Sequence, residues 1–204
     1  MKKSLFLVSI LLFVGCNDKN NYMEINGELR TDKGFNDEVI YLLPVGGNNT
    51  SSANKDSAIV KDGRFAIRRK ADSAYIAMLR TKNPLQSYFL QPLLVAIEPG
   101  TLEVRLDSVS YSNGTPLNNR LQTWKEKKSS FDYEEYRLRQ LFRKAEDSEK
   151  AVLEAQLAQN GKEYSEYNFN FVRENKDNPV GRFIYSMTKF LFTEEQRKTL
   201  DMPE

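Results

Sequence analysis

The chain has 204 residues, with 30 lysines and arginines against 28 aspartates and glutamates, and it contains no histidine. This near balance of charge argues against a nucleic-acid partner, which requires a basic excess on one face. Without histidine, the chain cannot form a Ser-His-Asp or Cys-His catalytic system, or a metal site with a histidine ligand. Catalysis by carboxylates alone and a calcium site with oxygen ligands stay open, but no residue pattern points to either. We therefore predict a non-enzymatic protein with no cofactor and no bound metal.

Residues 1–15 have the layout of a bacterial export signal. Two lysines precede an apolar run over residues 5–14, which is followed by Gly15 and Cys16. The run is too short to cross a bilayer as a helix, which takes about 20 apolar residues. A cysteine directly after a small residue is typical of a lipoprotein cleavage site, although Phe13 stands where leucine is usual. We predict that this signal peptide is removed and that Cys16 carries a diacylglyceryl group; the alternative is a buried structural cysteine.

Lipidation of Cys16 would decide where the protein resides. Acyl chains contribute about 0.8 kcal/mol per buried methylene, and stable anchoring takes more than one chain. Residues 16–21 would then form a lipidated tether, and Asn17 in place of aspartate favours the outer membrane. We therefore predict a membrane lipoprotein that faces the periplasm. Because Cys16 is the only cysteine, its acylation leaves no thiol for redox chemistry or for a disulfide.

From Tyr22 to about Tyr111, apolar and polar side chains alternate with the period of β-strands. The run 39–45 is apolar on both faces, which predicts a central strand. Asp62-Gly63 lies between two alternating runs, a pattern typical of a hairpin whose type I′ turn needs positive φ at both positions. Pro92 predicts a sheet edge or a break in its strand. About six to eight short strands with this spacing of turns predict an antiparallel β-sandwich.

From residue 116 onward the apolar period becomes that of a helix. Apolar residues between Leu117 and Ala145 recur at alternating spacings of four and three, which predicts one long amphipathic helix. A second helix is expected after it, weakened by Gly161.

Two capping patterns mark the starts of later helices. Asn178 followed by a proline is typical of an N-cap and a first helical residue. Thr193 with Gln196 matches a capping box for one last short helix. The predicted fold class is therefore α+β, with an antiparallel β-sandwich over residues 22–115 and three to four helices over residues 116–204.

Several stretches of the first half match a known kind of domain. They are INGEL at 25–29, VIYLLP at 39–44, DSAIVKDGRFAI at 56–67, IEPGTLEVRLD at 97–107 and NGTPLNNRL at 113–121. In these stretches the chain resembles a β-sandwich domain of unknown function that occurs in secreted bacterial lipoproteins. In that family a helical connector follows, often with an N-P-x-G helix start, which is matched here at 178–181. A thioredoxin-like domain of the peroxiredoxin/cytochrome-maturation type comes next.

The chain departs from this family at the redox domain. Its last residue, Glu204, falls about where the thioredoxin-like domain would begin, and the family's redox cysteines have no counterpart in the sequence. The resemblance therefore implies no thiol-disulfide activity for this chain, and it implies no catalytic residue in the sandwich.

Three serines are candidates for modification. Ser57, Ser73 and Ser108 each follow an aspartate and precede a small apolar residue, which resembles the acceptor motif for protein O-glycosylation in some bacteria. The alternative is structural, because aspartate and serine also mark turns and the starts of strands through local backbone hydrogen bonds.

The helical half is rich in aromatic and charged side chains. The aromatic residues could bind a sugar or a protein partner, but side chains at helical spacing more often form core; they are Trp124, Tyr133, Tyr136, Tyr164, Tyr167 and Tyr185. Acidic and basic residues are interspersed between residues 134 and 154, which favours ion pairs on a solvated face over a metal site or an acid-base pair.

Two functions from different classes follow from these patterns. The first is a non-catalytic binding or scaffold module that is anchored to the membrane and binds a periplasmic protein partner. The second is a truncated or split component of a thiol-disulfide system, which would act beside a separate thioredoxin-like protein. A hydrolase that uses only carboxylates is a third and weaker hypothesis.

Overall fold

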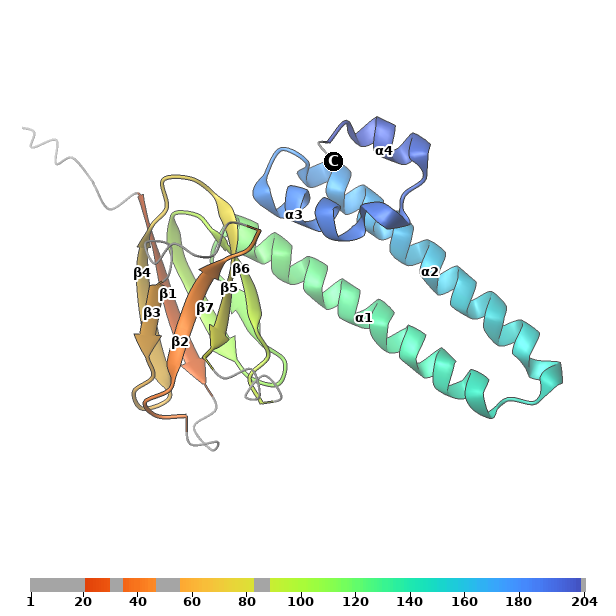
Figure 1. The fold of residues 1–204 in the computed structure, drawn as a ribbon, viewed down its shortest axis with the longest axis horizontal. Helices are drawn as coiled ribbons and strands as arrows, with labels where there is room; N and C mark the ends of the chain where they lie inside the picture. The colour runs from red at the N-terminus through yellow and green to blue at the C-terminus, as the bar shows by residue number, and fades with distance from the viewer. Residues whose placement is uncertain (1–20, 30–34, 47–55, 83–88, 203–204) are drawn as a thin grey trace, which may run out of the picture.

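The computed structural model describes residues 21–29, 35–46, 56–82 and 89–202. Their first half forms two sheets of four strands that face each other (Figure 1). In order across the sheet, sheet A contains β4 (Arg64–Lys70), β1 (Tyr22–Leu29), β7 (Gly100–Leu106) and β8 (Tyr111–Asn113). Sheet B contains β3 (Asp56–Ile59), β2 (Val39–Pro44), β5 (Tyr75–Thr81) and β6 (Leu93–Ile97). The predicted β-sandwich is confirmed.

The alternating pattern of the strands places one set of side chains between the sheets. In β1, Met23, Ile25 and Leu29 are buried, whereas Glu24, Asn26 and Glu28 are exposed. Gly27 occupies an inward position, and a Cβ there would overlap the ring of Phe65. The glycine therefore makes room for an aromatic side chain of the neighbouring strand β4. β2 lies inside sheet B, as the apolar residues on both of its faces predicted.

Pairing direction differs from the prediction at one place. The paired strands of the described chain run antiparallel except β1 and β7, which are parallel with Met23 opposite Gly100. The turn before β7 carries the chain from sheet B into sheet A, so β7 arrives beside β1 from the other layer. The period-two pattern could not show this, because it is the same for both directions.

The turn at Asp62-Gly63 forms, but the hairpin around it does not. Both residues have positive φ, 49° and 71°, and Lys61 and Arg64 exchange two backbone hydrogen bonds of 2.9 Å. The strands on either side then enter different sheets, β3 in sheet B and β4 in sheet A. The prediction of a two-stranded hairpin is therefore wrong. The turn instead joins the two layers at one end of the sandwich.

Pro92 marks the start of an edge strand, as predicted. β6 begins at the next residue and lies at one end of sheet B. An edge position suits this proline because its nitrogen cannot donate to a neighbouring strand.

Residues 116–202 form four α-helices and one 3₁₀ turn. They are α1 (Pro116–Lys144), α2 (Asp147–Asn175), α3 (Pro179–Thr188), η5 (Lys189–Leu191) and α4 (Glu194–Leu200). The predicted N-cap is confirmed, since the Asn178 side chain accepts hydrogen bonds from the backbone nitrogens of Val180 and Gly181. The capping box of Thr193 and Gln196 is also present. No helix among the described residues is both long and apolar enough to cross a membrane.

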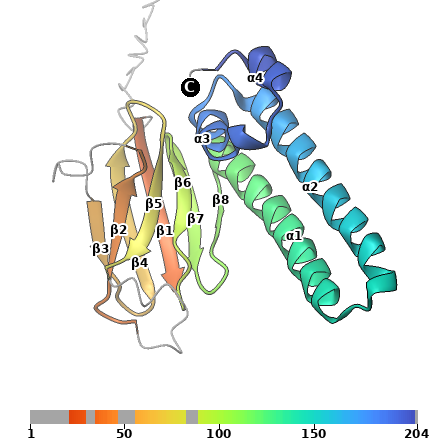
Figure 2. The same cartoon turned by 45° about the vertical axis from the view of Figure 1, so that its right-hand side comes forward.

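The helices share a second core with the sandwich. Trp124 of α1 and Ile184 of α3 belong to a buried cluster that also contains Ile76 of β5 and Ala96 of β6. The first turns of α1, together with α3, therefore cover part of the outer face of sheet B. The remaining length of α1 and α2 projects away from the sandwich as a helical hairpin (Figures 1 and 2).

Hydrogen bonds from the start of α1 complete the edge of β6. The Asn118 side chain, which is fully buried, accepts from the Ala96 nitrogen at 2.9 Å and donates to the Ala96 oxygen at 2.7 Å. The Glu98 carboxylate accepts from the backbone nitrogens of Leu117 and Asn118, at 2.7 and 3.2 Å. The carboxylate thus binds two of the backbone N–H groups that have no hydrogen-bond partner within the first turn of a helix.

The next turns of α1 bind the edge of the other sheet. The Gln122 side-chain oxygen accepts from the Ser112 nitrogen of β8 at 3.3 Å, and Lys125 donates to the Ser110 oxygen at 3.1 Å. Asn118, Gln122 and Lys125 are spaced by four and three residues and so lie on one face of the helix. We call these three side chains the α1 polar stripe. It bridges the edge strands of both sheets on the same side of the sandwich, where their backbone groups would otherwise lack partners.

Replacing Asn118 by alanine should therefore lower the free energy of unfolding by about 2–4 kcal/mol, because two backbone groups of Ala96 would be left buried and unpaired. Urea unfolding followed by circular dichroism measures the loss. Asn119→Ala is the matched control, since this exposed neighbour accepts one hydrogen bond, from the Gly114 nitrogen. We expect it to cost less than about 1 kcal/mol. Equal losses in the two variants would contradict the role given to Asn118.

Candidate functional site

The structure places the sequence-predicted site residues apart from one another. Cys16 lies outside the described residues. Ser57 is exposed on the edge strand β3, Ser73 is exposed in the turn between β4 and β5, and Ser108 is exposed in the turn after β7. The three serines therefore form no common site, although each is accessible.

The aspartates before these serines take part in local structure. Asp56 pairs with Arg69 of β4, and Asp72 pairs with Lys70 at 3.2 Å. Asp107 accepts a hydrogen bond of 2.7 Å from the backbone nitrogen of Ser108. The structural interpretation of the motif thus accounts for the aspartates, while the serine hydroxyl groups stay open to solvent.

The aromatic side chains of the helical half divide into three groups: buried, half-buried and exposed. Tyr164 and Tyr167 are half-buried, and their ring centroids lie 5.4 and 6.0 Å from that of Phe131. Trp124 and Tyr185 are buried, and the Trp124 indole donates to Asn168 at 2.9 Å, so the expectation of core is confirmed for both. For Tyr133 and Tyr136 it is wrong, because they are 68% and 62% exposed. Both lie out of phase with Phe131 and Leu138, the buried residues of this part of α1.

The charged residues of the hairpin form the expected ion pairs within each helix. Three pairs at spacings of three or four residues are Arg137–Glu134, Arg139–Glu135 and Lys150–Asp147. Within the described ranges, no three or more His, Cys, Asp or Glu side chains are placed to hold a metal ion.

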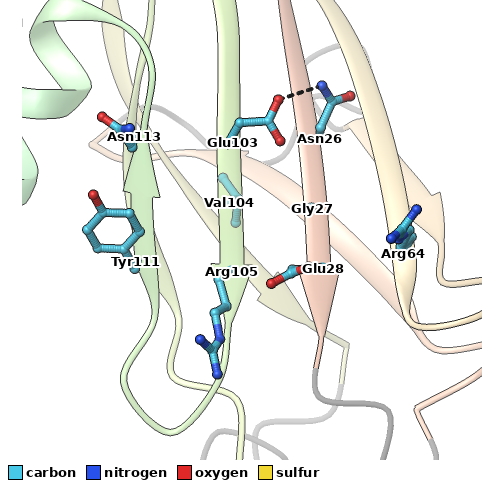
Figure 3. Close-up of a pocket in the computed structure, with 9 residues that line it drawn as sticks. All are labelled: Asn26, Gly27, Glu28, Arg64, Glu103, Val104, Arg105, Tyr111 and Asn113. Carbon is cyan, nitrogen blue, oxygen red and sulfur yellow. Dashed lines mark hydrogen bonds between the residues drawn. The ribbon is translucent and has the colours of Figure 1, made fainter.

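The candidate site is a hollow of about 510 Å³ on the outer face of sheet A (Figure 3). We call it the sheet A hollow. Its floor is the backbone of β1 and β7, and its polar side chains come from all four strands of the sheet; they are Asn26, Glu28, Arg64, Glu103, Arg105, Tyr111 and Asn113. The strand pattern puts them on one face because they are the outward residues of alternating strands.

Strand register sets the order of charges across the hollow. Glu28 of β1 pairs in register with Arg64 of β4 on one side and with Arg105 of β7 on the other. Arg105 in turn lies opposite Tyr111 of β8, which is 44% exposed. A carboxylate between two guanidinium groups, with an aromatic ring at the end, thus forms one row across the sheet.

A second row contains amide groups. Asn26 pairs in register with Glu103 and donates to its carboxylate at 2.9 Å, drawn as the dashed line in Figure 3. Asn113 of β8 lies next to Glu103 on the other side. The hollow therefore offers hydrogen-bond donors and acceptors, both signs of charge and one aromatic ring on a solvent-facing surface.

The α1 polar stripe determines where β8 lies and thus where Tyr111 lies. Tyr111 stands between Ser110 and Ser112, the two residues whose backbone groups bond to Lys125 and Gln122. Burial lowers the pKa of Lys125 to about 8, although the nearby Glu126 carboxylate opposes this shift. This half-buried lysine was missed from the sequence, where it looks like one of many surface cations.

The lowered pKa of Lys125 predicts how stability changes with pH. Between pH 8 and 10.5 the folded chain has lost this proton while the unfolded chain still holds it, so the free energy of unfolding rises with pH across that range. Lys125→Met removes this contribution, so the stability of the variant relative to the wild type should fall as pH rises from 8 to 10.5. Urea unfolding at several pH values measures the difference.

The control for this experiment is Lys162→Met, which alters an exposed lysine of α2. Its stability relative to the wild type should show no comparable change over the same range. A pH-independent difference between Lys125→Met and the wild type would contradict the lowered pKa.

Comparison with known proteins finds one family. Residues 23–121 match the model of a family described as a domain of unknown function (DUF4369). No curated protein and no solved structure matches the chain. Apart from Tyr22, the matched region contains all eight described strands, together with residues 116–121 of α1, and so includes Asn118 and the sheet A hollow. This part of the chain is thus similar to a domain of unknown function, as the resemblance implied.

Proposed function

We propose that this protein is a non-catalytic, membrane-anchored lipoprotein of the periplasm that binds a protein partner through the sheet A hollow. The observation that carries the proposal is the row of Arg64, Glu28, Arg105 and Tyr111 across an open sheet face. Arginine and tyrosine are among the residues that most often dominate binding energy at protein interfaces.

The chemistry of the hollow suits a peptide surface with mixed charge. Arg64 can bind a carboxylate in a two-pronged geometry. Arg105 already lies 3.4 Å from the Asp107 carboxylate and can bind a second one through its remaining N–H groups. Glu28, between them, can accept from a cationic or amide group. The outer position on the sheet leaves room for a broad partner, because no described helix covers this face (Figure 2).

Membrane anchoring is the second part of the proposal and rests on the sequence around Cys16. The lipidated tether of residues 16–21 would lead directly into β1, which begins at Tyr22. The acyl groups would hold the domain at the outer membrane, facing the periplasm. Ser57, Ser73 and Ser108 are exposed and so accessible to O-glycosylation in that compartment.

A photoreactive phenylalanine derivative in place of Tyr111 should capture the partner in intact cells. Arg64→Glu together with Arg105→Glu should reduce the adduct by roughly tenfold or more, because two charge contacts become repulsive. Immunoblotting measures the adduct, and mass spectrometry then tells a thioredoxin-like partner from another periplasmic protein.

The matched control carries the same photoreactive residue at Thr199, which is exposed on α4. The Tyr111 adduct should be absent there. An adduct that forms equally at both positions, or that is unchanged by the charge reversals, would show that the hollow is not the binding site.

Metabolic labelling tests the anchor. We expect radioactive palmitate to label the wild-type chain and not Cys16→Ser, since the chain has no other cysteine. The variant should also move from the membrane fraction to the soluble fraction. Membrane retention of the unlabelled variant would show that something other than the predicted lipid anchors the protein.

A further inference from the structure

The outer part of the α1–α2 hairpin has too little core of its own. Between residues 147 and 167, α2 has no buried residue. Over the same length of the hairpin, α1 buries Phe131 and Leu138. Each helix has 29 residues, about 43 Å at 1.5 Å per residue. Helices of this kind owe most of their stability to packing of an apolar face, so this hairpin has a face left to pack.

That face is a groove between the two helices. Two adjoining hollows of about 480 Å³ each run along it, and both include Val152. We call them together the hairpin groove. Leu138, Leu141 and Val152 line it; Leu141 is 44% exposed and Val152 is 60% exposed. Contiguous exposed apolar side chains mark binding surfaces, and Leu141 and Val152 line the same hollow.

The two rims of the groove carry opposite charge. Arg137 and Lys144 lie on the α1 rim, and Glu149 and Glu163 lie on the α2 rim. Glu134, also on the α1 rim, pairs with Arg137 of its own helix, so the net positive charge of that rim comes from Lys144. The sequence near the tip of the hairpin follows the same division, because residues 136–145 hold four basic and no acidic side chains, whereas residues 146–156 hold four acidic and one basic.

We propose that the hairpin groove is the interface of a homodimer, in which the hairpins of two copies pack face to face as a four-helix bundle. A two-fold axis parallel to the hairpin places α1 of each copy on α2 of the other. Leu141 and Val152 then meet in the new core, and the basic rim of each copy faces the acidic rim of its partner.

Charge selects this arrangement over the alternative two-fold. An axis perpendicular to the hairpin would place α1 against α1 and α2 against α2, so that helices of like charge meet. The parallel axis pairs opposite rims at the same height along the hairpin. It also brings both sandwiches to the same end of the bundle, so both sheet A hollows and the starts of both β1 strands would lie at that end of the dimer.

Sedimentation equilibrium of the full chain carrying Cys16→Ser tests the dimer without the lipid. We expect reversible dimers in the micromolar range. Val152→Glu should weaken the dimer by about tenfold or more, since it places a charge in the new core of both copies. Tyr133→Glu is the control, because Tyr133 is 68% exposed and does not line the groove. It should leave the dimer unchanged, and circular dichroism confirms that both variants stay helical.

A charge-swap experiment tests the orientation. Lys144→Glu and Glu149→Lys, each alone, should weaken self-association by about tenfold, because like charges meet twice across the axis. An equimolar mixture of the two variants should recover dimers, since residue 144 of one copy faces residue 149 of the other. This recovery cannot come from contacts within a single copy.

Three results would overturn the proposal: a monomer at 200 µM (roughly the upper range in which weak complexes of this kind are detected), a dimer unaffected by Val152→Glu, or a mixture that associates no better than its components. The first would leave the groove to a different partner. The other two would place the dimer contact elsewhere or in another orientation.

Discussion

The hydrogen bonds between α1 and the edge strands of both sheets are the constraint on which the rest of the structure depends. A sandwich of two open sheets has unpaired backbone groups along its edges, which must be covered or left to solvent. Asn118 satisfies both backbone groups of Ala96, and Gln122 and Lys125 bind the backbone beside Tyr111. One helix thus closes one side of the sandwich, and its direction sets where the hairpin projects.

The repeating features of the fold could be predicted from the sequence, and the contacts between its parts could not. Apolar residues recur with a period of two in the strands and of about 3.6 in the helices, so both kinds of element could be predicted. The Asn178 cap could be predicted as well, because it is a pattern of residue types. Asn118 and Lys125 looked like solvent-facing residues of an amphipathic helix, because their partners are backbone groups that carry no residue signature. For the same reason the parallel pairing of β1 and β7 was invisible. The sheet A hollow was missed because alternation shows only that its residues point outward, not which strands become neighbours.

The sheet A hollow and the hairpin groove depend in different ways on the junction between α1 and the sandwich. Tyr111 lies in the sheet A hollow between the two residues that α1 holds by their backbone. The hairpin groove begins farther along the same helix, beyond the region that packs on the sandwich. A rigid junction would therefore fix the distance and orientation between a binding face and a dimer interface, and a lipid at the N-terminus would hold both near one membrane. In the proposed scaffold, α1 would link the two parts because it packs in the core of the helices and is hydrogen-bonded to the edge strands of both sheets.

Residue-specific hydrogen exchange in increasing denaturant tests that central claim most directly. If α1 unites the sandwich and the helices, the amides of Ala96 in β6, Ser112 in β8 and Asn118 in α1 should exchange through the same global unfolding, with one free energy and one denaturant dependence. The opposite result would be exchange of the α1 amide through a separate opening of much lower free energy, while the sheet amides stay protected. That result would show that the helices are attached to the sandwich without being part of its cooperative structure, and it would contradict the account.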